Sequence, residues 1–120
     1  MKKLFVLLII VLGLCGCSSD SLNESGIISY DDAKRLADDG AVLVDVRSQE
    51  EYDAGHIEGA VLLPVDTIDK ESASQLFISS KQTIIVYCRS GARSSEAYKK
   101  LVDLGYTEVY DLGSIDNWRE

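Results

Sequence analysis

The feature that most constrains the fold is a series of apolar runs separated by amphipathic stretches. The runs cover residues 41–46, 60–63, 83–87 and, more weakly, 108–112. Such runs are typical of strands buried on both faces. Helical stretches lie between them, at about residues 49–54, 67–77 and 94–104. This alternation predicts an α/β domain with a parallel sheet that is covered by helices on both sides.

A short helix is also predicted ahead of the first apolar run. Ser29 is followed three residues later by Asp32, which resembles a capping box, and Gly40 ends the apolar stripe that follows. Residues 18–26 are polar and have no apolar period, so they are predicted to be a flexible tether. The folded domain is therefore expected to cover residues 27–120.

The N-terminus has the pattern of an export signal. Two lysines precede an apolar run that is shorter than the roughly 20 residues needed to cross a bilayer. The run ends in Leu14, Cys15, Gly16 and Cys17, which resembles the bacterial lipobox. Residues 1–16 are therefore predicted to be a lipoprotein signal peptide, with Cys17 as the lipidated residue.

A lipid on Cys17 would hold the domain at a membrane of the cell envelope, outside the cytoplasm. Bulky Leu14 stands where cleavage before Cys15 would need a small residue, so Cys15 fits poorly as the acceptor. The alternative is an ordinary secretory signal with coincidental cysteines.

Charge and cysteine content narrow the possible functions. Twenty acidic residues against twelve basic ones give a formal charge of −8, so no nucleic-acid partner is expected. Once Cys15 is removed and Cys17 is lipidated, Cys88 is the one free thiol left. No disulfide within the chain is then possible, and Cys88 is either a buried inert residue or a reactive one.

The residues around Cys88 favour a reactive thiol. Cys88 follows the apolar run 83–87 and precedes the predicted helix 94–104, which places it at the carboxyl end of a strand. The loop and the helix N-terminus would turn backbone N–H groups toward its sulfur and lower its pKa. Gly91 would allow the turn, and Ser94 or Ser95 would cap the helix. Arg89 and Arg93 would add positive charge, unless they are ordinary solvated surface residues.

Three blocks of the chain, in order, resemble the rhodanese family of sulfurtransferases. The first block runs from Asp45 to Pro64, the second is the loop from Cys88 to Ser94, and the third runs from Leu104 to Trp118. The sequence departs from the family pattern at Glu58, Leu62 and Ser114, which leaves the loop chemistry in place but affects how its neighbours are held.

The resemblance implies a three-layer, single-domain fold with a five-stranded parallel sheet. It also implies that Cys88 is the catalytic nucleophile, which takes a sulfane sulfur from a small anionic donor such as thiosulfate. A thiol, possibly on a protein, or cyanide would then accept the sulfur from a Cys88 persulfide. No metal or cofactor is expected. The substrate-binding residues would be those of the loop: Arg89, Ser90, Gly91, Ala92, Arg93 and Ser94.

Other polar residues of the first block are expected to have supporting roles. Arg47 and Glu51 are four residues apart, so an ion pair between them is predicted. Asp45 is a candidate for orienting the active-site loop through hydrogen bonds. The resemblance places His56, the one histidine, in a structural turn, and an ionised Cys88 needs no general base.

Three alternatives remain at this stage. Cysteine phosphatases have one residue more between the cysteine and the arginine than the four between Cys88 and Arg93, so phosphatase activity is a minor hypothesis. A lipid-anchored, noncatalytic rhodanese-like binding module is a second, although such modules typically lack the loop cysteine. A carrier that passes persulfide to a protein partner would use the same residues as the enzyme.

Overall fold

The structure of the protein is a computed structural model that describes residues 26–119. Its centre is one sheet of parallel strands in the order β3-β2-β4-β5. The strands are β2 (Val42–Asp45), β3 (Val61–Leu62), β4 (Thr83–Cys88) and β5 (Glu108–Ser114). The predicted parallel sheet is thereby confirmed, and each of the four apolar runs contributes one strand.

The prediction of five strands was wrong, because the sheet has four within residues 26–119. Ile27 forms only an isolated parallel bridge to Asp111, beside β5. Two backbone hydrogen bonds support this bridge, from Asp111 N–H to the Gly26 oxygen and from Ile28 N–H to the Asp111 oxygen. The bridge does not continue toward Tyr30, because Ser29 already caps the first helix, which begins at that residue.

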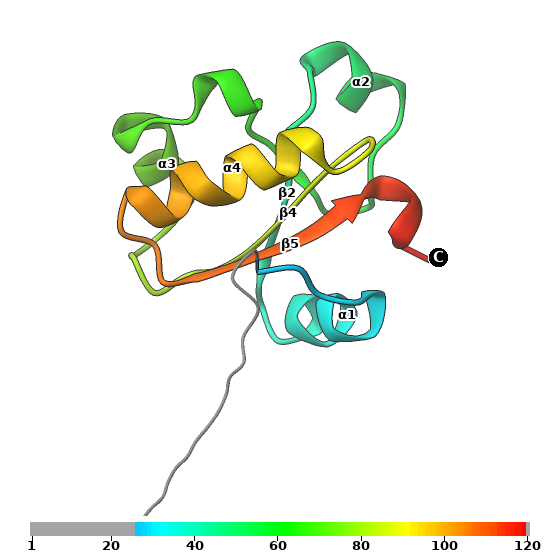
Figure 1. The fold of residues 1–120 in the computed structure, drawn as a ribbon, viewed down its shortest axis with the longest axis horizontal. Coiled ribbons are helices and arrows are strands. Elements are labelled where there is room, and N and C mark those ends of the chain that lie inside the picture. Colours follow the sequence, from blue (N-terminus) through cyan, green and yellow to red (C-terminus); the bar gives the residue numbers. More distant parts are fainter. Residues whose placement is uncertain (1–25, 120) are drawn as a thin grey trace, which may run out of the picture.

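Helices cover both faces of the sheet, as predicted. Helix α1 lies on one face, α3 and α4 lie on the other, and α2 lies near the carboxyl ends of the strands (Figure 1). The helices are α1 (Tyr30–Asp38), α2 (Gln49–Ala54), α3 (Lys70–Leu76) and α4 (Ala92–Asp103), with 3-10 turns at Val65–Thr67 and Ile115–Asn117.

Alternation along β4 divides the core between the two faces. Ile85 and Tyr87 pack in the layer that contains Ala33 of α1, whereas Val86 and Cys88 pack in the layer that contains residues of α3 and α4. These four residues of β4 are fully buried. The sulfur of Cys88 therefore belongs to the α4 side of the sheet, directly beneath the start of that helix.

Two helix boundaries differ from those predicted. The expected helix over residues 67–77 is a 3-10 turn followed by α3, because Asp69 accepts a hydrogen bond from the Ser72 N–H and starts a new helix there. Helix α4 begins at Ala92, two residues earlier than predicted. Its N-cap is Gly91 in the left-handed region, so the prediction that Ser94 or Ser95 caps the helix was wrong.

Candidate active site

The loop after β4 surrounds the sulfur of Cys88 with backbone donors. The Gly91 N–H donates to Cys88 Sγ at 2.9 Å, and the Ser94 N–H donates at 3.3 Å. Gly91 reaches this position with a φ of 104°, a conformation that favours glycine. Since both donors belong to the N-terminal turn of α4 or its cap, the positive end of the helix also faces the sulfur. This is the anion-binding arrangement that the sequence predicted.

The loop makes Cys88 more acidic than an ordinary cysteine. Burial by itself raises the pKa of the thiol, because a buried charge is poorly solvated. Hydrogen bonds from the Ser94 N–H, the Gly91 N–H, the Ser94 side chain and the Ser90 N–H together outweigh burial and lower the pKa below its ordinary value. The Cys88 residue is fully buried, at 0% exposure.

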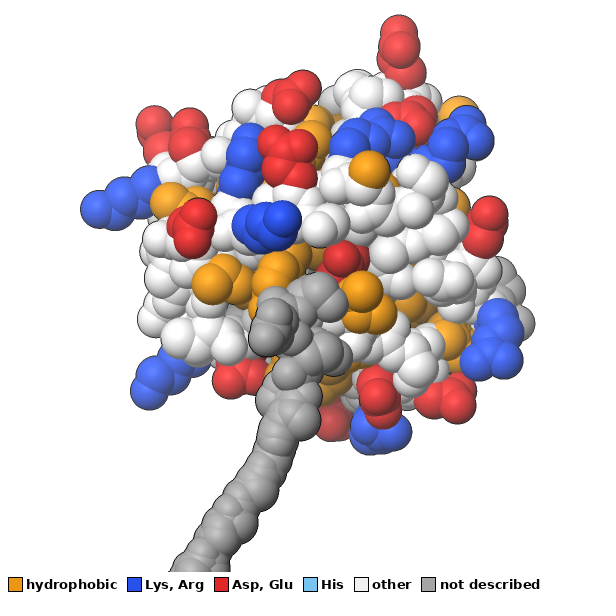
Figure 2. Space-filling model, in the orientation of Figure 1, with side chains coloured by type: hydrophobic (Ala, Val, Ile, Leu, Met, Phe, Trp, Pro, Cys, Tyr) orange, Lys and Arg blue, Asp and Glu red, His pale blue; other side chains and the backbone are white. Residues whose placement is uncertain are grey.

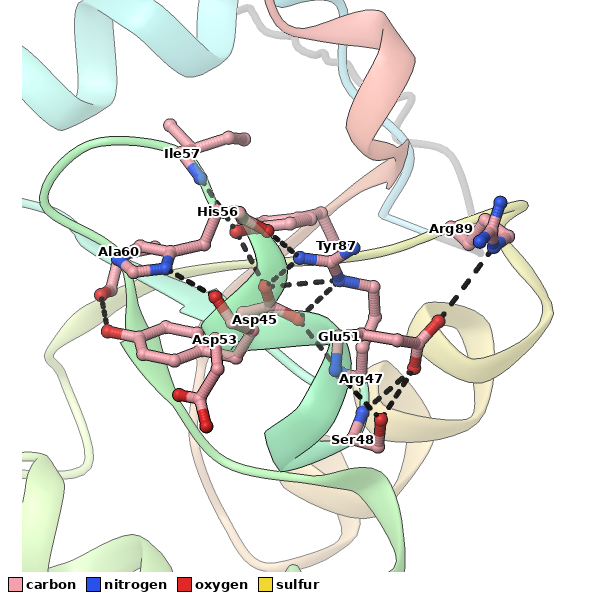
Figure 3. Close-up of polar contacts among 12 residues, drawn as sticks. Asp45, Arg47, Ser48, Glu51, Asp53, His56, Ile57, Ala60, Tyr87 and Arg89 are labelled. Atoms are coloured by element: carbon pink, nitrogen blue, oxygen red, sulfur yellow. Dashed lines mark hydrogen bonds and ion pairs between the residues drawn. The ribbon is translucent and has the colours of Figure 1, made fainter.

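Glu51, which was predicted to pair with Arg47, contacts both arginines of the loop instead. Arg93 donates from Nη1 to Glu51 Oε1 at 2.7 Å and from Nη2 to Oε2 at 3.1 Å. Arg89 Nε lies 3.8 Å from Glu51 Oε2, and Figure 3 shows this contact across the gap between α2 and the loop. The Arg93 guanidinium is the main reason that the pKa of Glu51 is far below its usual range. Glu51 is therefore a carboxylate at the mouth of the loop.

The position of Glu51 is fixed by its own helix. Ser48 caps α2, and its N–H and hydroxyl both donate to Glu51 Oε1 at 3.0 Å. This capping box was the signal in the sequence, a serine three residues before a glutamate at a helix start. The predicted pair of Glu51 with Arg47 was wrong, because Arg47 turns toward the buried Asp45 instead.

Asp45 and Arg47 form a buried cluster with Tyr87. Arg47 Nη2 lies 2.7 Å from Asp45 Oδ2 and also donates to the Gly55 oxygen, while the Tyr87 hydroxyl donates to Asp45 Oδ2 at 2.9 Å (Figure 3). The Tyr87 oxygen in turn accepts the Ile57 N–H. Every described hydrogen bond of the Asp45 carboxylate is to Arg47 or Tyr87, and none of them is to a residue of the loop itself. Asp45 instead fixes Tyr87, the residue before Cys88.

The loop is also fixed from β5. The Ser114 hydroxyl donates to the Arg89 oxygen at 2.7 Å, which connects the end of β5 to the residue after Cys88. Asp111 of β5 is buried beneath the loop, where its carboxylate accepts the Gly113 N–H and interacts with the Ser94 side chain. Burial raises the pKa of Asp111 above its ordinary value. Ser114 and Asp111 are supporting residues that the sequence analysis did not assign.

His56 is exposed, and its described contacts are with Tyr52. Its ring stacks on the tyrosine ring with centroids 3.7 Å apart, and Nδ1 lies 2.8 Å from the Tyr52 oxygen. Within residues 26–119, no group of three or more His, Cys, Asp or Glu side chains is arranged to hold a metal ion.

Several predictions concern residues outside the described part of the chain. The signal peptide over residues 1–16, the lipidated Cys17 and nearly all of the tether lie before residue 26. None of the helices in residues 26–119 has the length and apolar character to span a membrane.

Comparison with known proteins assigns the family. The Rhodanese-like domain family matches residues 29–120. The chain is 37% identical over 100 residues to "Thiosulfate sulfurtransferase GlpE" of Pseudomonas fluorescens, which covers 82% of this chain and 88% of that protein. It is 34% identical over 103 residues to "Adenylyltransferase and sulfurtransferase UBA4" of Meyerozyma guilliermondii, which covers 81% of this chain but only 24% of that longer protein.

The fold has solved counterparts. A structure described as "rhodanese with anions from E. coli" superposes with a TM-score of 0.61 at 31% identity. The superposition covers 65% of this chain and 91% of that one. The likeness extends beyond the cysteine loop to most of the domain.

Proposed function

Because the chain belongs to the rhodanese-like domain family, we propose that it is a sulfurtransferase that acts through a Cys88 persulfide. The observation that carries this proposal is the pair of backbone N–H groups at 2.9 and 3.3 Å from Cys88 Sγ, which favours the thiolate. The same donors would hold an anionic sulfur in each step without a metal. Relatives named as thiosulfate sulfurtransferases support this reaction class.

In the first step, the Cys88 thiolate attacks the outer sulfur of an anionic donor such as thiosulfate. An S–S bond to Cys88 forms as the S–S bond of the donor breaks, and sulfite leaves with the electron pair. The product is a Cys88 persulfide anion, so no proton has to be transferred. The loop N–H groups face the region in which the negative charge moves from one sulfur to the next.

In the second step, an acceptor thiolate or cyanide attacks the outer sulfur of the persulfide. The Cys88 thiolate leaves, and the acceptor becomes a persulfide or thiocyanate. The enzyme returns to its starting state, as a ping-pong cycle requires. The acidic character of Cys88 serves this step also, because a more acidic thiol is a better leaving group.

Mass spectrometry of the intact protein tests the cycle. Incubation with thiosulfate is expected to add one sulfur atom, and cyanide is expected to remove it and yield thiocyanate. The variant Cys88→Ser is expected to do neither. A folded protein whose Cys88 accepts no sulfur from thiosulfate or from a persulfide would refute the proposal and favour a binding module.

We also propose that Cys17 carries a lipid that anchors the domain in the cell envelope. The proposal is supported by the order of Leu14, Gly16 and Cys17 after a positively charged start and an apolar run. Mass spectrometry of the protein extracted from membranes is expected to find an acylated Cys17, and Cys17→Ser is expected to release the domain from the membrane fraction. An unmodified Cys17 in membrane-extracted protein would contradict the proposal.

A further inference from the structure

Glu51 controls the charge at the entrance to the Cys88 loop. Its carboxylate is 24% exposed and ionised, and the Ser48 cap holds it in place independently of any ligand. Arg93 presents two N–H groups to this carboxylate in a bidentate pair, which is the geometry that guanidinium groups use for oxyanions. Glu51 therefore occupies two of the five N–H donors of Arg93 that a sulfonate group could otherwise use.

Glu51 lowers the net positive charge that a substrate meets at the entrance to the loop. The entrance has two cations, Arg89 and Arg93, and the carboxylate of Glu51, so these three groups have a net charge of +1. The rest of the protein offers no compensating positive field, because the chain has a formal charge of −8 and acidic and basic side chains are interspersed on the face shown in Figure 2. A dianion such as thiosulfate thus meets only one unit of net positive charge.

We propose that Glu51 is a specificity-determining residue that favours singly charged sulfane-sulfur donors, such as persulfides and thiosulfonates, over the thiosulfate dianion. This inference rests on the proposed sulfurtransferase function. The reaction with a thiosulfonate balances in the same way as that with thiosulfate. The Cys88 thiolate forms an S–S bond to the outer sulfur, the S–S bond of the donor breaks, and a sulfinate leaves with the electron pair.

Glu51→Gln is the variant of choice because an amide oxygen can still accept from Ser48 and Arg93 while the negative charge is removed. Thiosulfate and methanethiosulfonate are the two donors, since they share the reacting S–S bond and differ by one charge. A unit charge about 8 Å from a dianion, at an effective dielectric constant of about 60, changes kcat/KM by about tenfold, and by about threefold for a monoanion.

Glu51→Gln is therefore expected to raise kcat/KM about tenfold for thiosulfate and about threefold for methanethiosulfonate, mainly through KM. Glu50→Gln is the matched control. Glu50 is exposed on the same helix and has the same formal charge, but the described partner of Arg89 and Arg93 is Glu51. The Glu50 variant is therefore expected to leave the ratio of the kcat/KM values for the two donors unchanged. Circular dichroism of each variant checks the fold.

An equal change for both donors would overturn the inference, because a merely structural role of Glu51 has no dependence on donor charge. If Glu51→Gln does not fold, Glu51→Ser replaces it, because it removes the same charge. Its kcat/KM is again expected to rise about tenfold for thiosulfate and about threefold for methanethiosulfonate, and equal changes for the two donors would again refute the inference. Failure of wild-type Cys88 to take sulfur from either donor would instead refute the proposed function.

Discussion

Replacing Gly91 with alanine tests whether a backbone N–H group makes Cys88 acidic. An added Cβ would meet only the Gly113 Cα, at 3.9 Å, so the site has space for it. The φ of 104° is the obstacle, since a left-handed conformation costs an alanine about 1–2 kcal/mol. Relaxation to a negative φ would turn the Gly91 N–H away from Cys88 Sγ, now 2.9 Å distant.

Loss of one hydrogen bond to a charged acceptor costs about 1.5–3 kcal/mol, so the ionisation constant of Cys88 is expected to fall about 10- to 100-fold. The pKa of the native thiol lies below its ordinary value, and ionisation is lost as the pH falls through that pKa. In Gly91→Ala the pKa rises, so the loss begins at a higher pH. Ultraviolet absorbance of the thiolate against pH, with Cys88→Ser as the baseline, measures this directly.

Gly40→Ala is the matched control for this experiment. Gly40 has a φ of 107° and open space around its Cα, but it lies in the turn after α1, far along the chain from the loop. Both variants are expected to lose similar stability, whereas only Gly91→Ala is expected to change the titration of Cys88. An unchanged titration in a destabilised Gly91→Ala protein would refute the assignment of the Gly91 N–H as a thiolate donor.

Three further variants test the supporting contacts. Asp45→Ala leaves the Arg47 guanidinium buried without its partner, so a loss of about 3–5 kcal/mol is expected in the free energy of unfolding from urea titration. Ser114→Ala removes the 2.7 Å hydrogen bond to the Arg89 oxygen, so the free energy of unfolding is expected to fall by about 0.5–1.5 kcal/mol. Hydrogen exchange in the loop is expected to become faster, and unchanged exchange would contradict the role of Ser114. Leu101→Ala opens a cavity under α4 and is expected to cost about 2–5 kcal/mol, measured by the same titration.

The elements that sequence predicted well are those governed by local patterns. The run 83–87 is nearly all apolar because β4 is buried on both faces from Ile84 onward. The predicted bounds of α2 agree with the structure because Ser48 and Glu51 form a local cap. The number of strands was missed for a different reason. At the outer edge of β5, Ile27 forms a bridge to Asp111, and α1 begins soon after it. The apolar pattern of the sequence does not indicate how many residues of such a segment pair with the sheet.

The ion-pair partners within the site could not be predicted from local sequence patterns either. Glu51 and Arg93 are 42 residues apart, and they meet only because α2 and the start of α4 lie at the same end of the sheet. The expected partner, Arg47, has the favourable helical spacing to Glu51. A buried carboxylate attracts it more strongly than a solvated one, because Asp45 at 0% exposure has no water to replace the guanidinium.

Two of the donors to Cys88 Sγ, the Gly91 and Ser94 N–H groups, belong to the main chain, and this has a consequence for how such a protein can change over evolutionary time. Substitutions at Arg89, Ser90 and Ala92 alter the rim of the loop but remove neither the Gly91 nor the Ser94 N–H from the sulfur. The reactivity of the Cys88 thiolate and the preference for a particular sulfur donor can therefore change independently of each other. A lineage can exchange one sulfur compound for another through its rim residues while the reactive sulfur is retained.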